Sequence, residues 1–159
     1  MRKFQQVEEK FLKFPDVETV KPSRSDRFSA GYDFYSKEHY MLMPGESHVF
    51  WTDVKAVMWF DNVLMLFARS GLGTKKGVVP RNCVGIIDAS YAGNEANDGN
   101  IGICLQNNGS EPVVIEVGDR IAQGIFTRYL ITDDDPLMKR SAKGEKETKR
   151  KGGFGSSGK

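Results

Sequence analysis

Long apolar runs are missing from this sequence. The longest covers residues 63–68, whereas a helix that crosses a bilayer needs about 20 apolar residues. The first thirty residues are interrupted by charges throughout and hold no apolar stretch of signal-peptide length. The sequence therefore predicts a soluble protein with no membrane partner, and we expect it to be cytoplasmic.

Cysteine and histidine are scarce as well, and neither sign of charge is in large excess. Neither Cys83 nor Cys104 has a His or Cys neighbour at zinc spacing, and both lie in apolar stretches, so we expect buried, reduced thiols. His39 and His48 have no companions that suggest a metal site or a catalytic triad. Lys and Arg total 23 against 21 Asp and Glu, a net charge of +2. This balance excludes a protein that coats nucleic acid non-specifically.

Turn-forming and aromatic residues are plentiful by contrast. The 159 residues include 17 Gly, 6 Pro, 10 Phe, 5 Tyr and 2 Trp, a composition that favours strands and turns and excludes a long helical bundle. This length leaves room for one sizeable core. We divide the chain into a charged lead-in over residues 1–29, one domain over residues 30–131 and a C-terminal arm over residues 132–159. Within the lead-in, QQVEEKFLKF is compatible with a helical turn or with a strand.

The middle zone has the pattern of an all-β sandwich or barrel. Short apolar or alternating runs recur there at roughly even spacing and are separated by turn signals. Strands are predicted over residues 41–43, 48–57, 63–68, 83–87, 101–105, 112–117 and 120–129. Turns are predicted at residues 44–45, 61–62, 71–77, 94–100, 107–110 and 118.

The arm over residues 132–159 has almost no apolar residues. Such a segment cannot bury enough surface to offset its ordering entropy, so we expect it to be disordered when free. Phe154 lies between glycines at its end and has nothing local to pack against. The residue is either a solvated leftover or part of a tail that folds over a ligand. In the second case its ring would stack, and Gly and Ser groups would bind phosphates.

A basic, glycine-rich stretch follows the run over residues 63–68. It reads RSGLGTKKG and starts at Arg69. Glycine lets backbone N–H groups approach an anion, Ser70 supplies a donor, and the Arg69 guanidinium offers a forked one. The same composition also suits a surface turn. A P-loop is excluded, because the chain lacks a strand followed by GxxxxGK[ST].

An acidic residue ends the apolar run over residues 84–87. Asp88 could serve as general base for water or help to hold a divalent ion if it lies beside a bound phosphate. Alternatively its carboxylate hydrogen-bonds its own turn, as Asp after a strand commonly does. Tyr91 is either a core residue or a flat wall for a sugar or base.

Two further polar residues stand in apolar surroundings. Asp33 lies in AGYDFYS and needs a partner if it is buried, but not if it is a turn residue. Gln123 lies in GDRIAQG between Ala122 and Gly124, which suggests a buried hydrogen-bonding task or an edge position.

In their order along the chain, these motifs resemble the five motifs of the homotrimeric dUTPase family, whose members hydrolyse dUTP to dUMP and pyrophosphate. The segment AGYDFYS is similar to the first motif, RSGLGTKKG to the second, NCVGIIDASYAG to the third, GDRIAQ to the fourth and GGFGSSG to the fifth. The resemblance covers Ala30 to Gly158. It implies a jelly-roll-like β barrel or sandwich assembled as a homotrimer, with sites where subunits meet and a flexible arm that closes each site.

The resemblance also implies a role for each matching residue. Asp88 would be the general base, and Tyr91 would stack beneath the deoxyribose and leave no space for a 2′-hydroxyl. Asp33 would support the site near the metal region. Uracil would be read by Asn82 and by the backbone of Ile86, Ile87 and Gly102. The phosphates would be held by Arg69, Ser70, Gly71, Gln123 and Arg150. The arm would contribute Phe154, Gly155, Ser156 and Ser157.

Mg²⁺ is the expected cofactor, held mainly by substrate phosphates and water. Attack at the α-phosphorus of a triphosphate is blocked by repulsion until cations neutralise the oxygens, and the ligands on offer are hard oxygens. The resemblance names no direct protein ligand.

Two departures from the family pattern leave alternatives open. The segment NEANDGN, residues 94–100, lengthens the hairpin after the third motif, and Lys149 and Lys151 compete with Arg150 as the phosphate clamp. A dCTP deaminase or a bifunctional deaminase and dUTPase is the first rival. Gly71 and Tyr91 favour the hydrolase, and Glu95 keeps the deaminase open. The second rival is a dUTPase-like regulatory binding protein that uses residues 94–100 to contact a partner.

Overall fold

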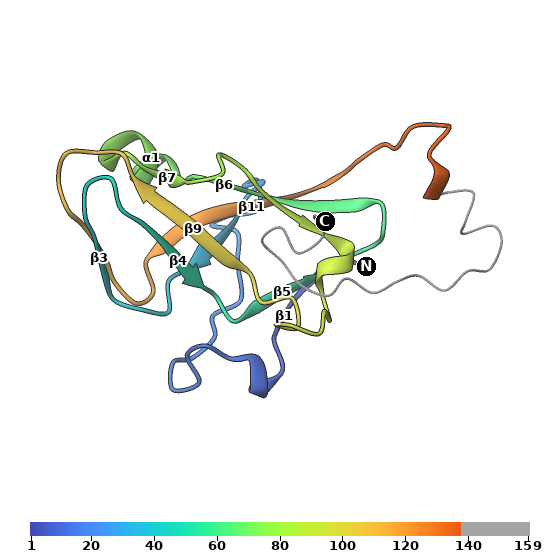
Figure 1. Ribbon diagram of the computed structural model, residues 1–159, viewed down its shortest axis with the longest axis horizontal. Coiled ribbons are helices and arrows are strands. Elements are labelled where there is room, and N and C mark those ends of the chain that lie inside the picture. The colour runs from blue at the N-terminus through green and yellow to red at the C-terminus, as the bar shows by residue number, and fades with distance from the viewer. Residues whose placement is uncertain (138–159) are drawn as a thin grey trace.

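The computed structural model describes residues 1–137, and every bound given below belongs to that part of the chain (Figure 1). The predicted arm residues Arg150, Phe154, Gly155, Ser156 and Ser157 lie outside it. The strands are β1 (Lys3–Gln6), β2 (Tyr32–Tyr35), β3 (Tyr40–Leu42), β4 (Ser47–Trp51), β5 (Val54–Val57), β6 (Asn62–Phe67), β7 (Val78–Pro80), β8 (Gly85–Asp88), β9 (Gly102–Asn107), β10 (Val113–Ile115) and β11 (Arg120–Arg128). The helices are α1 (Ser70–Lys76) and two 3-10 turns, η1 (Glu9–Phe11) and η2 (Ala89–Tyr91).

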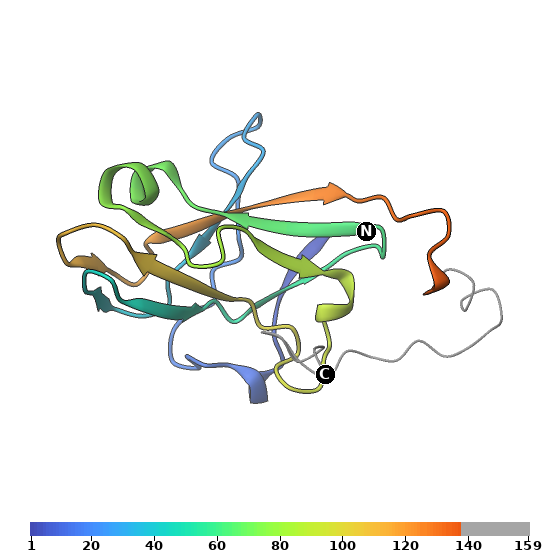
Figure 2. The ribbon, with the colours of Figure 1, turned by 45° about the horizontal axis from the view of Figure 1, so that its top comes forward.

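Two antiparallel sheets form the body of the fold. The larger has the order β2-β11-β6-β8 and the smaller the order β4-β9-β7, and Figure 2 shows β6 and β11 lying over β4 and β9. The pairs β1-β5 and β3-β10 extend this arrangement. One apolar core joins the sheets, with Phe34 and Leu64 from the first and Phe50 and Leu105 from the second all fully buried. The all-β prediction is confirmed.

The predicted strands over residues 41–43, 63–68, 101–105, 112–117 and 120–129 are confirmed, with no end shifted by more than two residues. The strands β1, β2 and β7 were not predicted. No helix in residues 1–137 is long and apolar enough to cross a bilayer.

The predicted strand over residues 48–57 is wrong as a single element, because Asp53 divides it into β4 and β5. Asp53 has a φ of 56°, a left-handed conformation that breaks the ladder. Its carboxylate is fully buried and receives the Lys37 Nζ at 2.8 Å and the backbone N–H groups of Lys13 and Phe14 at 2.8 and 3.0 Å. This buried ion pair fastens the lead-in to the fold.

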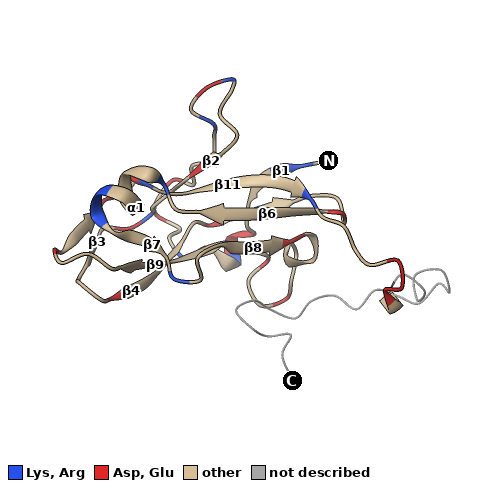
Figure 3. Ribbon diagram, turned by 90° about the horizontal axis from the view of Figure 1, so that it is seen from above, with Lys and Arg blue, Asp and Glu red and all other residues tan. Residues whose placement is uncertain are grey.

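The predicted turn at residues 71–77 is also wrong, because this stretch forms α1. Gly77 ends the helix at φ 69°, and its N–H bonds back to the Gly73 carbonyl at 3.2 Å, an arrangement that suits glycine after a last turn. Lys75 and Lys76, the blue band on α1 in Figure 3, lie at the helix C-terminus, where its dipole favours cations. Glycine and lysine at these places were the overlooked helix signals.

The lead-in segment QQVEEKFLKF contains the end of one strand and a helical turn. Strand β1 pairs with β5 along four residues, and the chain turns through η1 directly afterwards. Phe4 of β1 lies 5.3 Å from the Tyr32 ring and 5.5 Å from the Phe34 ring, measured between centroids. Residues at the start of the chain therefore pack against the first motif.

Candidate functional site

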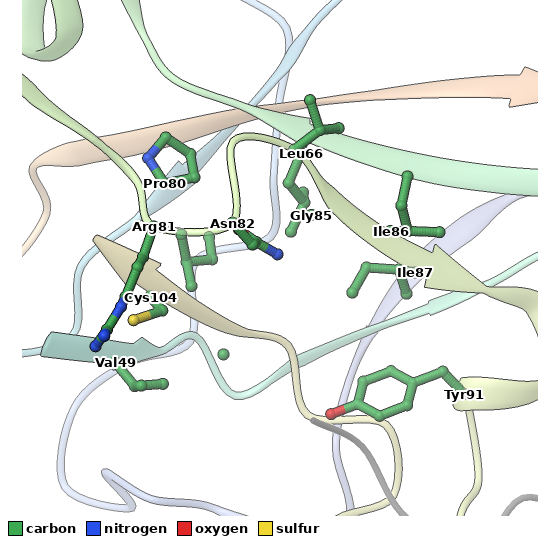
Figure 4. A pocket seen from close by; sticks show the side chains of 13 residues that line it. Val49, Leu66, Pro80, Arg81, Asn82, Gly85, Ile86, Ile87, Tyr91 and Cys104 are labelled. Atoms are coloured by element: carbon green, nitrogen blue, oxygen red, sulfur yellow. The ribbon is translucent and has the colours of Figure 1, made fainter. Parts of the chain in front are cut away.

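A cavity of about 640 Å³ opens between the end of β7, strand β8 and strand β9 (Figure 4). Figure 4 places Asn82 and Tyr91 at different sides of it, and β8 forms a wall between them. The residues predicted to read the base, which are Asn82, Ile86, Ile87 and Gly102, all line this cavity, and so does Tyr91, which is predicted to lie beneath the sugar. The structure therefore brings together one half of the predicted site.

The walls of the cavity combine apolar side chains with accessible backbone. Gly102 is needed at its place on β9, because a Cβ there would lie 3.0 Å from the Trp51 ring and from Val49 Cγ1. Gly85 is similarly close to Leu66 across the β6-β8 pair. The two glycines thus make room for the Trp51, Val49 and Leu66 side chains, which pack closely against β8 and β9 beside the cavity.

The two cysteines flank this cavity as free thiols, but they are not buried. Cys83 is exposed and Cys104 is half-buried, with Cys104 lining the wall. The prediction of buried thiols is wrong for a local reason. Cys83 adopts φ 62° in a turn closed by its N–H to the Pro80 carbonyl at 3.0 Å, and β8 starts only at Gly85. The predicted strand over residues 83–87 is corrected accordingly.

Tyr91 is a core residue and a wall of the cavity at the same time. Its side chain is 6% exposed and belongs to the core cluster, and its hydroxyl donates to the Asn100 carbonyl at 2.9 Å. Asp88 ends β8 immediately before η2, where it is half-buried and opposite Val63 of β6. Tyr91 is therefore a core residue that also lines the cavity, and its role as a wall for a sugar or base stays a prediction.

A second cluster surrounds Asp33. Its carboxylate is 6% exposed and pairs with the Arg69 Nε at 2.8 Å and, more weakly, with the Arg120 Nη1 at 3.4 Å. Asp33 is thus a buried acid with cationic partners rather than a turn residue. These pairs hold two guanidinium groups at one end of the larger sheet, where β2, β6 and β11 meet.

Gln123 joins this cluster from the middle of β11. The strand pairs with β2 on one side and β6 on the other, which excludes the edge position. Gln123 is half-buried, and its amide donates to the Ala68 carbonyl at 3.0 Å, so the hydrogen-bonding alternative is the one that the structure shows. A Cβ on Gly31 would lie 2.7 Å from the Gln123 Oε1, so the glycine of AGYDFYS makes room for this side chain.

Ser70 and Gly71 are exposed in the first turn of α1, next to Arg69. They are helical residues rather than part of an extended phosphate loop. Among residues 1–137, no three His, Cys, Asp or Glu side chains gather into a group able to hold a metal ion.

The two halves of the predicted site lie apart within one chain. Strand pairing places Asp88 opposite Val63, at the start of β6, whereas Arg69 follows the end of that strand. From Val63 to Phe67 alone, β6 extends roughly 13 Å at about 3.3 Å per residue. The structure thus separates Asp88, and Tyr91 that follows it, from Arg69 and Gln123 at the other end of β6.

Sequence reasoning missed several residues of both halves. Arg120 lies inside GDRIAQ and was not singled out, although a cation three residues before a motif glutamine is a readable signal. Arg81 lines the cavity, and its guanidinium donates to the Ser47 hydroxyl at 2.9 Å. Asn97 donates to the Tyr91 hydroxyl at 2.8 Å, a contact that the insertion's composition does not reveal.

Together, the fold and these clusters define an all-β protein with a cavity suited to a flat polar ring and a separate cationic cluster suited to an anion. Comparison with known proteins gives the family. The dUTPase family model matches residues 18–158. The deoxyuridine 5'-triphosphate nucleotidohydrolases of Lactococcus lactis and Haemophilus influenzae are 42% and 35% identical over 137 and 146 residues, covering 86% and 87% of this chain and 87% of each relative.

Solved structures agree. The crystal structure of a dUTPase from Streptococcus mutans is similar with a TM-score of 0.71 and 35% identity, over 82% of this chain and 98% of that one. A mutant dUTPase of phage phi11 of S. aureus shares the fold with a TM-score of 0.65 at 24% identity, over 84% of this chain and 94% of that one. The chain belongs to the dUTPase family.

Proposed function

We propose that the protein hydrolyses dUTP to dUMP and pyrophosphate, which keeps uracil out of DNA and supplies dUMP for thymidylate synthesis. The observation that carries this proposal is the cavity in which Asn82, Ile86, Ile87, Tyr91 and Gly102 meet, directly beside the strand that ends in Asp88. The named relatives that are at least 35% identical support the same substrate.

Uracil is proposed to bind against β8 and β9. The Asn82 amide and the backbone of Ile86, Ile87 and Gly102 provide fixed donors and acceptors. Cytosine reverses the polarity of its base edge and would leave buried groups unpaired, at about 1 to 3 kcal/mol per group. The methyl group of thymine would have to be excluded by steric fit against the closely packed backbone. Tyr91 would lie beneath the deoxyribose.

Asp88 is proposed as the general base. A half-buried carboxylate at a strand end can accept the proton of a water molecule that attacks the α-phosphorus. Arg69, Ser70, Gly71 and Gln123 are proposed to hold the phosphates, and Asp33 would act by orienting Arg69 through their 2.8 Å pair. From the arm, Arg150, Gly155, Ser156 and Ser157 would contact the triphosphate, and Phe154 would cover the uracil.

Mg²⁺ is the proposed cofactor, and the mutant phi11 dUTPase coordinates a structural Mg(II) ion. The described residues fit an ion held mainly by substrate phosphates and water, since Asp33 is already engaged by two arginines and Asp88 stands apart from other acids in β8. Bound there, Mg²⁺ would neutralise the phosphate oxygens. Arg69 and Gln123 would orient the phosphates, and Asp88 would hold the water.

A homotrimer is the proposed assembly. Asp88 and Arg69 lie at opposite ends of β6 in one chain, so a site that uses both must combine neighbouring copies. Sites shared between symmetry-related subunits are a normal consequence of closed assembly. The division into residues 1–29, 30–131 and 132–159, with the last closing the site as an arm, and the cytoplasmic location stay predictions.

Both rivals remain open to a direct test. Glu95 of the insertion is exposed, whereas a deaminase needs an acid at the base. A regulatory partner could reach the exposed part of residues 94–100, but Asn94, Asp98 and Asn100 of that segment are buried in the chain's own fold.

Incubation of the pure protein with Mg²⁺ and each deoxynucleoside triphosphate in turn should release pyrophosphate from dUTP alone. Ammonia from dCTP would favour the deaminase, and no pyrophosphate from dUTP would refute the proposed function.

A further inference from the structure

The insertion over residues 94–100 is fixed to the body of the protein along its length. Asp98 has a φ of 56°, and its carboxylate receives the Lys55 Nζ at 2.6 Å and the Glu8 N–H at 2.8 Å. Gly99 follows at φ 86°, and a Cβ there would lie 2.8 Å from the Ala92 Cα. A segment held by a buried ion pair and by close backbone contact keeps one conformation, so its side chains can position other groups.

The asparagines of this segment form hydrogen bonds that begin and end at Tyr91. The Asn94 amide donates to the Tyr91 carbonyl at 2.8 Å and to the Asn97 Oδ1 at 2.6 Å. The Asn97 Oδ1 also accepts from the Gly99 N–H at 3.0 Å. The Asn97 Nδ2 in turn donates to the Tyr91 hydroxyl oxygen at 2.8 Å. Both the backbone and the phenol of Tyr91 are therefore held by the insertion.

The hydrogen bond that the Tyr91 hydroxyl donates is also made to a residue of the segment. The Tyr91 hydroxyl donates to the Asn100 carbonyl at 2.9 Å. The Asn100 side chain exchanges two bonds with Asp53, at 2.8 Å from its Nδ2 to the carboxylate and at 3.0 Å from the Asp53 N–H to its Oδ1. Because Asp53 is paired with buried Lys37, this acceptor cannot shift without disturbing the core.

Two hydrogen bonds to one phenol oxygen set the tilt of its ring as well as its position. A phenol accepts along its lone pairs and donates along its O–H bond, so Asn97 and Asn100 define two directions around the oxygen. The ring itself lines the cavity together with Ile87 and Gly102. The tilt of Tyr91 determines how closely a sugar can approach, and thus whether an added hydroxyl fits.

We propose that Asn97 is a positioning residue for sugar selectivity: through its hydrogen bond to the Tyr91 hydroxyl, the insertion holds the ring at the tilt that rejects a ribonucleotide. This inference rests on the proposed function, which makes dUTP the substrate and Tyr91 the residue beneath its sugar. Asn97 acts only through Tyr91 and touches no reacting atom. The insertion accordingly contributes to the selection of deoxyribose over ribose.

Two variants separate the positioning bond from the fold of the loop. Asn97→Ala removes all side-chain bonds, whereas Asn97→Asp keeps an oxygen for the Gly99 N–H and removes only the amide donors. Both should lower the ratio of kcat/KM for dUTP to that for UTP by roughly three- to tenfold, the value of one ordinary hydrogen bond. The change should arise mainly from a lower KM for UTP. Asn108→Ala, at an exposed asparagine in the turn after β9, is the matched control and should keep the wild-type ratio.

Binding of dUMP and UMP by calorimetry gives a second measure that does not depend on turnover. In both variants the preference for dUMP should fall by a similar factor, with an unfolding midpoint for Asn97→Asp near that of wild type. An unchanged dUTP-to-UTP ratio in both variants, with wild type active, would overturn the role of Asn97 and leave the proposed function intact. A wild-type protein that releases no pyrophosphate from dUTP would instead refute the proposed function.

Discussion

At the scale of single residues, Asp88 is the group on which the proposed chemistry depends. Replacing it by Asn preserves its shape at the end of β8 and removes the ability to accept a proton. A general base contributes about 100- to 10,000-fold to a rate, so Asp88→Asn should lower kcat by that factor while dUTP binding stays measurable. Pyrophosphate release and calorimetric titration with dUTP give the two quantities.

The control for this substitution is Asp16→Asn, the same change at an exposed acid of the lead-in. It should leave kcat at the wild-type value. Near-normal turnover in Asp88→Asn would remove Asp88 as the base and move the search to another acid. Loss of dUTP binding together with turnover would mean that Asp88 holds substrate rather than water.

Asp53, a second aspartate, allows a test of how a buried carboxylate contributes to folding stability. Its burial alone would raise its pKa, but hydrogen bonds from Lys37, the Lys13 N–H, Asn100 and the Phe14 N–H outweigh this and hold the pKa below its ordinary value. A carboxyl with a lowered folded pKa stabilises the protein above its unfolded pKa of about 3.9, and this stability is lost as the pH falls through the folded value.

Asp53→Asn should therefore cost about 3 to 5 kcal/mol of unfolding free energy at pH 7, because Lys37 would remain buried without its counter-charge. The difference from wild type should shrink below a pH of about 4, where the unfolded chain begins to take up a proton at Asp53, and it should be lost as the pH falls through the lower pKa of the folded state. Denaturant titrations at pH 7 and in acid measure both values. Glu8→Gln, in an exposed pair with Lys10, should behave as wild type. A pH-independent difference would contradict the ionic explanation.

At the scale of elements, strands with simple alternation were predictable and elements set by tertiary contacts were not. The runs that became β6, β9 and β11 alternate or are continuously apolar, and the pattern alone located them. The break at Asp53 depends on Lys37 and on backbone donors from residues 13 and 14, which are distant in sequence. A local pattern contains no signal for such partners.

Helix α1 and strand β1 show the two ways in which local reasoning failed. For α1, the glycines suggested a turn, although Gly77 after Lys75 and Lys76 is a helix-end pattern. For β1, the lead-in composition is charged and gives no clear period. Its pairing with β5 is specified by Phe4, whose ring packs among Tyr32, Phe34 and Phe126.

The attachment of β1 can be measured with a pair of phenylalanine substitutions. Phe4→Ala should lower the unfolding free energy by about 2 kcal/mol, because the half-buried ring leaves the aromatic cluster and a partial cavity remains. Phe28→Ala, at a ring that is 90% exposed, should leave it unchanged. Chemical denaturation of both variants gives the comparison. Equal midpoints would mean that the Phe4 ring adds nothing to the stability of the fold.

At the scale of the whole molecule, the sequence indicated the members of the site better than their arrangement. The motif resemblance grouped Asp88, Arg69 and Gln123 in one function, and the structure separates Asp88 from the other two along β6. Composition and periodicity describe one chain, so they contain no signal for the residues that a neighbouring copy would contribute to a site. The fold, by contrast, follows from the one core that both sheets share.

A mixing experiment tests whether copies share a site. Asp88→Asn and Arg69→Gln each remove one side of the proposed site, and glutamine retains a hydrogen bond to Asp33. If a site takes Asp88 from one copy and Arg69 from another, trimers refolded from equal amounts of both variants should recover about one quarter of wild-type activity, because half of the copies carry each intact residue. Either variant refolded alone should recover nothing beyond its own residual rate.

Light scattering on the same samples must show a trimer for the result to bear on subunit exchange. The alternative is a site within one chain, in which every mixed trimer still lacks Asp88 or Arg69 at each position. Activity equal to the mean of the two parent variants would then be observed and would refute the shared site. Because Asp88 and Arg69 lie at opposite ends of β6, we expect the mixed trimers to recover about one quarter of wild-type activity instead.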